Sequence, residues 1–272
     1  MRERLTTLLP GIALGLVLSA FPVAAAGVLQ VGGTGAAAAL LAHVGKPFTQ
    51  QTGIAVEVKL GLGSSGGISA LAAGILDVAV AGRPLSGAEA ARGLVPVITM
   101  RTPFVFVTSH RAPPSMTVPE IANVYTAEKV AWPDGSPVVL ILRPREDADN
   151  LQLAKYFLGK GDVLDRVRQR AELPVAVTDH DNAGMAERLK GSLAGASYAQ
   201  IILEQRNLRL IAIDGIVPSI ETLASGAYRP TKLLYFVHPL QPSAVASRFI
   251  QFLRSDEGVR ALREAHSLPG VE

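Results

Sequence analysis

From residue 28 onward, short apolar runs rich in β-branched residues alternate with longer segments rich in alanine and leucine. In chain order, the first of these segments are VLQVGG, AAAALLAHVGKPFTQQTG, VEVKLGLG, GGISALAAGIL and DVAVAGRPLS. Strands that alternate with helices are typical of a parallel or mixed sheet that helices cover on its faces. This alternation predicts a fold of the α/β class.

Three further apolar runs have the usual length of buried strands: FVFVTSH (104–110), PVVLILRP (137–144) and KLLYFVHP (232–239). An amphipathic pattern over 245–265 predicts a last helix. The chain is longer than most single domains, yet no stretch rich in proline and glycine marks a boundary between tandem domains. We therefore expect two lobes between which the chain crosses more than once, with a ligand-binding cleft between them.

The N-terminal segment 1–26 has the three parts of a secretory signal. Arg2 and Arg4 precede a long apolar run, and three alanines follow it at the expected cleavage site. A membrane anchor is the competing interpretation, but Pro10 and Pro22 interrupt the run. We expect a cleaved signal peptide over residues 1–26 and export to the periplasm.

The composition argues against several classes of function. The chain contains no cysteine, so we expect neither disulfides nor a cysteine-ligated zinc site, and its five histidines show no metal-ligand spacing. The net charge of +3 falls to +2 when the signal segment, with its two arginines and one glutamate, is removed. Without a run of lysine or arginine, a nucleic-acid partner is not expected. No Lys-Ser/Thr pair follows a glycine-rich loop, and we expect neither a metal nor a cofactor.

Two glycine-rich turns lie where a predicted strand meets a predicted helix. One holds Gly33 and Thr34, and the other holds Ser64, Ser65 and Gly66. Free backbone N–H groups and side-chain hydroxyls at the start of a helix favour the binding of an anion. The alternative is a tight turn that needs glycine only for its backbone angles. If the two turns end neighbouring strands of one sheet, their donors would converge on one anion.

Two arginines follow predicted buried strands, Arg83 after DVAVAG and Arg143 in LILRPREDADN. A guanidinium binds an oxyanion through two parallel hydrogen bonds, so both arginines are candidate ligand contacts. For Arg83 the alternative is a solvated arginine at the surface. Beyond Arg143, the acidic residues Asp147 and Asp149 fit the first turn of a helix equally well, because they complement the helix dipole there.

The sequence around Ser65 also fits, in part, the nucleophile elbow of a serine esterase or phosphatase. Such an enzyme needs a histidine base held by a carboxylate, and the best candidate is His180 between Asp179 and Asp181. The turn, however, carries two serines and two successive glycines, which favours a set of hydrogen-bond donors over a single nucleophile. Catalysis by Ser65 is therefore the third choice, and no enzymatic activity is expected.

Five stretches, in order, resemble the PstS-like periplasmic phosphate-binding proteins of ABC importers, within the type II solute-binding class. They are VGGTGAAAALL, GLGSSGGISALAAGILDVAVAGRPLS, TVPEIANVYTAEKVAWPDGSPVVLILRP, LIAIDGIVPSIETLASGAYRPTKLLYFV and FIQFLRSDEGVRAL. The resemblance implies a two-lobed type II periplasmic binding protein fold, with a mixed sheet in each lobe and an interlobe cleft. It implies that lobe one covers about residues 27–105 plus 212–272, and that lobe two covers about residues 106–211.

For the ligand, the resemblance implies a clamp that closes on an inorganic oxyanion, with phosphate as the first choice. The implied ligand contacts are Gly33, Thr34, Ser64, Ser65, Gly66 and Arg143, to which the strand-end pattern adds Arg83. The implied partner is the inner-membrane permease of an ABC importer, and the implied state is a monomer.

This chain departs from the family pattern at two places. Gly82 stands where many members have an aspartate, and EDADN stands where many have Ser-Gly-Thr after the arginine of lobe two. Carboxylates beside a desolvated dianion are unfavourable unless they point away or pair with Arg143 and Arg145. The second choice is therefore a binding or sensor protein of the same fold, for another anion or a small organic ligand.

Overall fold

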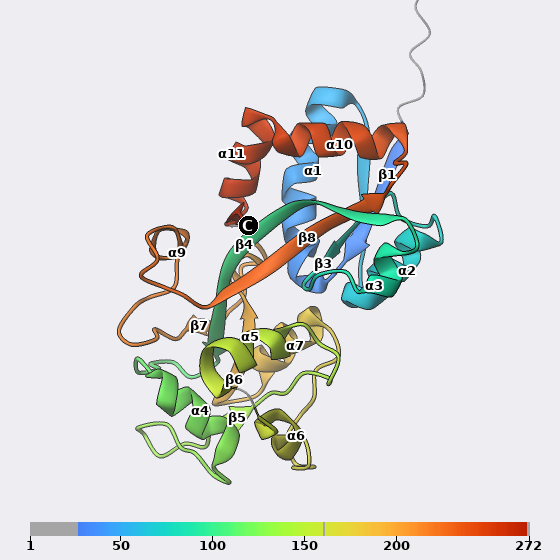
Figure 1. Ribbon diagram of the computed structural model, residues 1–272. Helices are drawn as coiled ribbons and strands as arrows, with labels where there is room; N and C mark the ends of the chain where they lie inside the picture. Colours follow the sequence, from blue (N-terminus) through green and yellow to red (C-terminus); the bar gives the residue numbers. More distant parts are fainter. Residues whose placement is uncertain (1–26, 160, 271–272) are drawn as a thin grey trace, which may run out of the picture.

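The structure is a computed structural model that describes residues 27–159 and 161–270 (Figure 1). The signal peptide predicted over residues 1–26 lies outside these described residues. Figure 1 shows two lobes joined by the long strands β4 (Leu94–Thr108) and β8 (Thr231–Pro239). The predicted α/β fold with two lobes is confirmed, while the exact residues that bound each lobe stay a prediction.

The sheets of the two lobes are continuous because β4 takes part in both. In the described part of the chain the strand order is β2-β1-β3-β8-β4-β6-β5, with β7 and β9 also paired to β4. In lobe one, β1 pairs in parallel with β2 and β3, and β8 pairs antiparallel with β3 and β4. In lobe two, β6 pairs antiparallel with β4 and in parallel with β5. Each lobe therefore has a mixed sheet, as predicted.

The elements follow the predicted alternation. The other strands are β1 (Val28–Gly33), β2 (Ala55–Lys59), β3 (Val78–Ala81), β5 (Val139–Leu140), β6 (Ser192–Ser197), β7 (Arg209–Leu210) and β9 (Leu268–Pro269). The helices are η1 (Gly35–Ala37), α1 (Ala38–Thr52), α2 (Gly63–Ala72), α3 (Gly87–Ala90), α4 (Val118–Thr126), α5 (Asp149–Leu153), η2 (Ala154–Leu158), α6 (Val163–Val167), α7 (Asp179–Arg188), α8 (Tyr198–Leu203), α9 (Ile220–Ala224), α10 (Ala244–Arg254) and α11 (Asp256–Glu264). Across the described residues, none of these helices has both the length and the apolar content needed to cross a bilayer.

Helices cover both faces of the lobe-one sheet. Val78 and Val80 of β3 face the core that contains α1, α10 and α11, whereas Ala79 and Ala81 face α2. This alternation follows from the two-residue period of a strand. Because β1 and β3 are parallel neighbours, their carboxyl ends lie side by side, at the edge of lobe one that meets lobe two.

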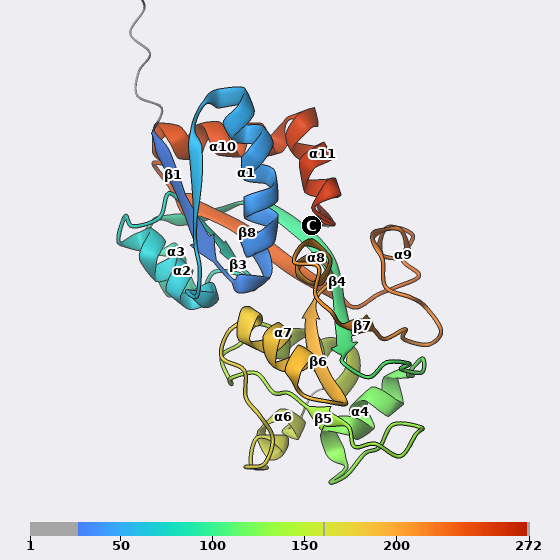
Figure 2. The same ribbon diagram turned by 180° about the vertical axis from the view of Figure 1, so that it is seen from behind.

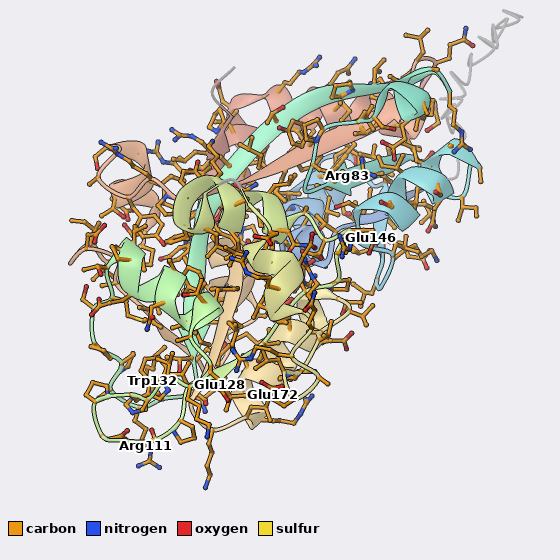
Figure 3. The ribbon with its side chains drawn as sticks, turned by 60° about the horizontal axis from the view of Figure 1, so that its bottom comes forward. Arg83, Arg111, Glu128, Trp132, Glu146 and Glu172 are labelled. Atoms are coloured by element: carbon orange, nitrogen blue, oxygen red, sulfur yellow. The ribbon has the colours of Figure 1, made fainter. Side chains whose placement is uncertain are left out.

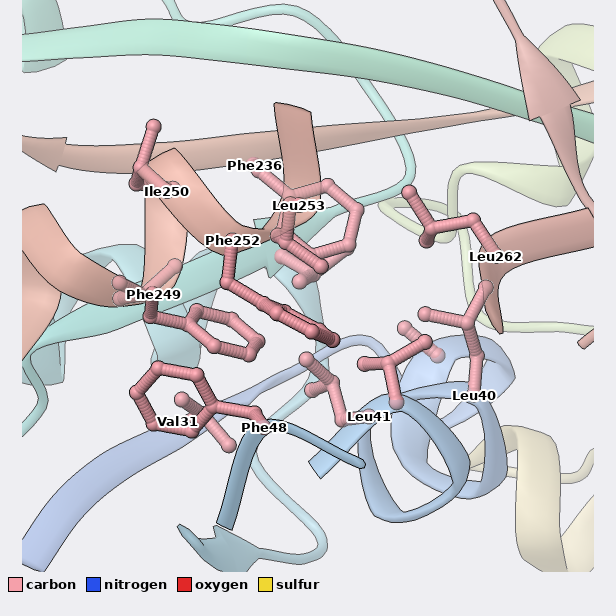
Figure 4. Close-up of a cluster of buried hydrophobic side chains, with 14 of the residues drawn as sticks. Val31, Leu40, Leu41, Phe48, Phe236, Phe249, Ile250, Phe252, Leu253 and Leu262 are labelled. Atoms are coloured by element: carbon pink, nitrogen blue, oxygen red, sulfur yellow. The ribbon is translucent and has the colours of Figure 1, made fainter. Parts of the chain in front are cut away.

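The helical pattern over 245–265 is two helices, α10 and α11, so the prediction of a single helix was wrong. Ser255 leaves the helical conformation, and its hydroxyl accepts a hydrogen bond from the N–H of Gly258 to cap α11. Apolar residues continue across this cap because both helices face the same core. In that core the rings of Phe48 and Phe249 meet edge to face, with centroids 5.2 Å apart (Figure 4).

Lobe two is built on the second half of β4. Phe104 and Phe106 face one of its cores, and Val105 and Val107 face the other. The Tyr228 hydroxyl donates a hydrogen bond to the carbonyl oxygen of Phe104 at 2.8 Å and so fixes the returning chain against this strand. The run predicted as a strand over 137–144 is shorter in the structure, where β5 holds two residues.

Candidate functional site

A cavity of about 290 Å³ lies between the two lobes. Three of the predicted contacts, Thr34, Ser64 and Arg143, line it. The complete lining is Thr34, Gly35, Ala38, Leu60, Gly61, Gly63, Ser64, Arg143, Asp147, Ala148, Val177, Thr178, Asp179, His180, Asp181 and Lys232. A cleft between lobes with a few convergent polar groups is the usual place for a small ligand, so we take this cavity as the candidate site.

A second hollow, of about 710 Å³, lies at the far end of lobe two. Glu128 and Glu172 are part of its lining. Figure 3 shows both of them at the opposite end of the molecule from Arg83. Because its walls come from one lobe, closure of the lobes would not enclose a ligand there.

β1 ends in a backbone conformation that favours glycine. Gly33 has a φ of 128°, and a Cβ there would lie 2.0 Å from the carbonyl oxygen of Val80. The next N–H group, that of Thr34, donates to the same oxygen at 2.8 Å. The Thr34 hydroxyl then donates across the cleft to Asp179 Oδ2 at 3.1 Å. Gly33 therefore shapes the turn, and Thr34 supplies the donor.

The second glycine-rich turn is the start of α2. A Cβ at Gly67 would lie 2.5 Å from the Cα of Gly33, so the two turns are in direct contact. Ser64 lines the cavity, and its hydroxyl accepts a hydrogen bond from the N–H of Gly82 at 2.9 Å. The two turns are thus neighbours at one edge of the sheet. This is the arrangement in which their hydrogen-bond donors could converge on one anion.

Ser65 and Arg83 contact each other beside this cavity. Arg83 donates to the Ser65 hydroxyl at 2.9 Å and makes two parallel hydrogen bonds, each of 2.9 Å, to the Glu89 carboxylate. The bond from Arg83 lowers the pKa of Glu89 to about 2. A guanidinium cannot accept a proton, so this neighbour of Ser65 is not the base that a serine nucleophile needs. Ligand contacts by Ser65, Arg83 and Gly66, which lies in the first turn of α2, stay predictions.

Arg143 is 5% exposed and is held within lobe two. Its Nη1 donates to the carbonyl oxygens of Thr178 and Ala176, the latter at 3.1 Å, and its Nη2 donates to Asp147 at 2.5 Å. Burial alone would lower the pKa of Arg143, but the carboxylates of Asp179 and Asp147 raise it above its ordinary value. Arg143 is therefore a fixed, permanent cation at the lobe-two wall of the cavity.

Lys232, near the start of β8, brings a second buried cation from lobe one. Its Nζ lies 2.6 Å from Asp149 Oδ1 and 3.0 Å from Asp179 Oδ1. Burial would lower the pKa of Lys232, but these two carboxylates raise it, so the amine stays protonated. Asp149 begins α5, and its burial outweighs the nearby Lys232 and raises the pKa of Asp149 to about 6.

Asp179 is the first residue of α7 and is 5% exposed. Its Oδ2 accepts hydrogen bonds from the Thr34 hydroxyl at 3.1 Å and from the Ala36 N–H at 3.0 Å. Its Oδ1 accepts from Lys232 at 3.0 Å and lies 3.6 Å from Arg143 Nη2. Burial would raise the pKa of Asp179, but Lys232 and Arg143 lower it below its usual range. The carboxylate is therefore ionised at neutral pH.

These buried charges form one group, the interlobe cluster, made of Arg143, Asp147, Asp149, Asp179 and Lys232. The cluster holds three carboxylates and two cations, and one proton on Asp149 would balance it. Within residues 27–159 and 161–270, no group of three or more His, Asp or Glu side chains is placed to hold a metal ion. The members of the cluster are joined to one another as ion pairs.

Sequence reasoning missed two members of the cluster, Asp179 and Lys232. Lys232 carried a signal, because it is a lysine at the start of KLLYFVHP, a run with the character of a buried strand. Asp179 appeared only as a neighbour of His180, and an acidic residue in the first turn of a helix is ordinary. His180 is itself exposed and contacts Arg206 at 2.9 Å.

A family model described as the PBP superfamily domain matches residues 22–257, which is most of the chain. This chain belongs to the PBP superfamily. No curated protein matches its sequence. Membership in the PBP superfamily agrees with a cleft between two lobes as the place where a ligand binds.

Solved structures of the same fold cover nearly all of this PBP-superfamily chain. A putative phosphate ABC transporter substrate-binding protein from Clostridium perfringens, solved with bound phosphate, has a TM-score of 0.75 and 17% identity, covering 90% of this chain and 100% of its own. An ABC-type phosphate transport receptor from Vibrio cholerae has a TM-score of 0.59 and 17% identity, and the match covers 88% of this chain and 99% of the Vibrio chain. The periplasmic molybdate-binding protein of Azotobacter vinelandii has a TM-score of 0.58 and 13% identity, covering 90% and 99%. The predicted PstS-like, two-lobed fold is confirmed, and these neighbours are binding proteins.

Proposed function

We propose that this PBP-superfamily protein binds a small inorganic oxyanion, with phosphate as the first candidate. The observation that carries the proposal is that donors from lobe one converge on a single carboxylate, that of Asp179. The Thr34 hydroxyl, the Ala36 N–H and the Lys232 ammonium are the kinds of donor that an oxyanion requires. The phosphate bound to the Clostridium protein and the name of the Vibrio protein, a phosphate transport receptor, support phosphate as the first ligand to test.

In this proposal the ligand lies between the lobes, where the Asp179 carboxylate lies in the structure. Lys232 and Arg143 offset its charge, and the Ser64 hydroxyl, which also lines the cavity, adds a donor from the start of α2. Closure of the lobes removes the anion from water and strengthens each of these interactions. The protein then acts as an exported, periplasmic monomer that delivers the anion to the permease of an ABC importer, without catalysis or a cofactor.

A second candidate ligand is a small organic molecule of neutral or positive charge, such as an amine. The negative excess of the interlobe cluster favours it, and so do two apolar side chains in the lining. Leu60 of lobe one and Val177 of lobe two are 69% and 70% exposed. Apolar side chains at the cavity favour contact with a carbon skeleton over a hydrated inorganic ion. The molybdate-binding protein shares the fold, so the fold by itself leaves the ligand open.

Isothermal titration calorimetry of the purified protein with phosphate, sulfate, molybdate and a set of small amines separates these candidates. The oxyanion proposal expects phosphate to bind, and expects Thr34→Val to weaken that binding by up to about 1 kcal/mol, since the donor lost to the anion is also lost to Asp179. Thr126→Val removes an exposed hydroxyl in α4 and is the matched control, with no expected effect. Binding of an amine, together with no response to any of the three anions, would reject the oxyanion and select the organic ligand.

A further inference from the structure

Asp179 belongs to lobe two, but its shortest contacts go to lobe one. Thr34, Ala36 and Lys232, the three donors to its carboxylate, are separated from it by 145, 143 and 53 positions in the chain. The packing is also close, since a Cβ at Gly35 would lie 3.0 Å from the Cβ of Asp179. Figure 2 shows α7 facing the end of lobe one where β1 passes into α1. The Asp179 carboxylate therefore ties the two lobes together, alongside the pair of Lys232 and Asp149.

The same donors are those that the proposed function assigns to the ligand. Asp179 Oδ2 accepts hydrogen bonds from both the Thr34 hydroxyl and the Ala36 N–H, and Oδ1 accepts one from Lys232. The Thr34 hydroxyl has a single proton to donate, and so has the Ala36 N–H. An oxyanion and the Asp179 carboxylate therefore cannot use these donors at the same time.

Electrostatic repulsion also opposes the binding of an oxyanion while Asp179 occupies the site. An oxyanion that entered beside Asp179 would meet three carboxylates, those of Asp147, Asp149 and Asp179, around only two cations. Like charges placed together in a site away from water are strongly unfavourable. If Asp179 moves out, Arg143 and Lys232 instead face two carboxylates, and the added anion is tolerated far better.

We propose that Asp179 is a built-in substitute for the anionic group of the ligand and the specificity-determining residue of the cleft. Without ligand, its carboxylate holds the lobes closed, and an oxyanion binds only after Asp179 releases Thr34 and Ala36. The competition between Asp179 and an oxyanion rests on the proposed function, whereas the tie between the lobes does not. The ligand-free protein is therefore closed, and its affinity for an oxyanion is lower than its donors alone would give.

The competition is tested by phosphate titrations of the wild type, Asp179→Asn and Asp179→Ala. Both variants leave two cations with two carboxylates, so the cluster stays compensated, and thermal unfolding checks that each variant is folded. The matched control is Asp181→Asn, which removes the same charge from the cavity lining at a residue bonded to Thr178 within lobe two. We expect phosphate to bind the Asp179 variants at least about tenfold more tightly. The Asp181 variant should gain much less, because Asp181 accepts its hydrogen bonds from Thr178 and from no donor of lobe one.

The outcomes separate this inference from the proposed function. If the wild type binds phosphate and Asp179→Asn binds it no more tightly, the competition is overturned while the proposed function stands. If neither the wild type nor any variant binds phosphate, the phosphate assignment and the competition fall together. Equal gains in affinity from Asp179→Asn and Asp181→Asn would show a general effect of charge and would also overturn the competition.

Small-angle X-ray scattering tests the tie between the lobes, whatever the ligand is. We expect the ligand-free wild type and Asp181→Asn to share one radius of gyration. Asp179→Ala should have a larger radius of gyration without ligand. A ligand-free Asp179→Ala with the radius of the wild type would overturn the tie.

Discussion

Arg83 and Arg143 both follow an apolar strand run, yet the structure gives them opposite surroundings. The Arg83 side chain is 21% exposed and pairs with Glu89, six residues further along the chain. The Arg143 side chain is 4% exposed and pairs with Asp147 and with Asp179. The first is a local pair at the rim of lobe one, and the second is one part of a buried cluster that spans both lobes.

The difference lies in how each charge is compensated. A partly solvated pair such as Arg83–Glu89 depends less on each partner than a fully buried pair does, because water can partly replace a partner that is removed. In the interlobe cluster, four of the five side chains are at most 7% exposed, and each ion depends on the others. Removing one cation there leaves carboxylates buried without a partner, which is among the most destabilising changes in a protein.

The largest expected effect follows from removing the cation that joins the lobes. Lys232→Met should destabilise the protein by about 3–5 kcal/mol, because Asp149 and Asp179 lose their shared partner in a buried site. Urea unfolding of the wild type and the variant measures this loss. Lys59→Met makes the same change in an exposed pair with Glu57 and should have almost no effect. Equal losses in the two variants would break the distinction between buried and exposed ions.

The sequence predicted the elements of lobe one better than it predicted this cluster. Gly33 and the Ser64 turn revealed two neighbouring strand ends, because glycine at a strand end reflects a local backbone need. The pairing of Lys232 with Asp179 joins residues 53 positions apart and depends on how the lobes close, which no periodicity encodes. Arg83 and Glu89 lie within one short segment, but nothing in the sequence of that segment showed whether Arg83 pairs with Glu89 or contacts a ligand.

Ser64 and Ser65 offer the same comparison between a residue at the cavity and a more exposed one, at neighbouring positions. The Ser64 hydroxyl accepts from the Gly82 N–H at the cavity, so Ser64→Ala should cost about 1–2 kcal/mol of stability by leaving that donor unpaired. Ser65 is exposed beside Arg83, so Ser65→Ala should change stability by less than about 0.5 kcal/mol. Urea unfolding of the two variants provides the test, and the reverse order of losses would contradict a stabilising role for the hydrogen bond from the Gly82 N–H to Ser64.

The pH dependence of stability sharpens the comparison further. Burial raises the pKa of Asp149 to about 6, above its value in the unfolded chain, so the folded state binds the extra proton first. Stability should therefore rise as the pH falls from 7 to 5, by on the order of 1 kcal/mol. Glu89 behaves in the opposite way, since its pKa is lowered to about 2 and its contribution is lost only in stronger acid.

Asp149→Asn isolates the contribution of Asp149 from those of the other ionisable groups. The difference in unfolding free energy between wild type and Asp149→Asn should change between pH 7 and pH 5, and Glu89→Gln should show no such change. A constant difference for Asp149→Asn would mean that Asp149 does not change its protonation state between pH 7 and pH 5, and would contradict a pKa raised to about 6.

The last variant, Arg83→Lys, tests the pair of Arg83 and Glu89 itself. A lysine keeps the positive charge beside Glu89 but cannot reproduce the two parallel hydrogen bonds of the guanidinium, so we expect a loss below about 1 kcal/mol. Because the Arg83 guanidinium donates to Glu89 and Ser65, calorimetry should give Arg83→Lys the same phosphate affinity as the wild type. A clear fall in affinity would restore Arg83 as a ligand contact that turns toward the cleft when an anion binds. The rim pair would then belong to the binding site, and its difference from the interlobe cluster would be one of exposure alone.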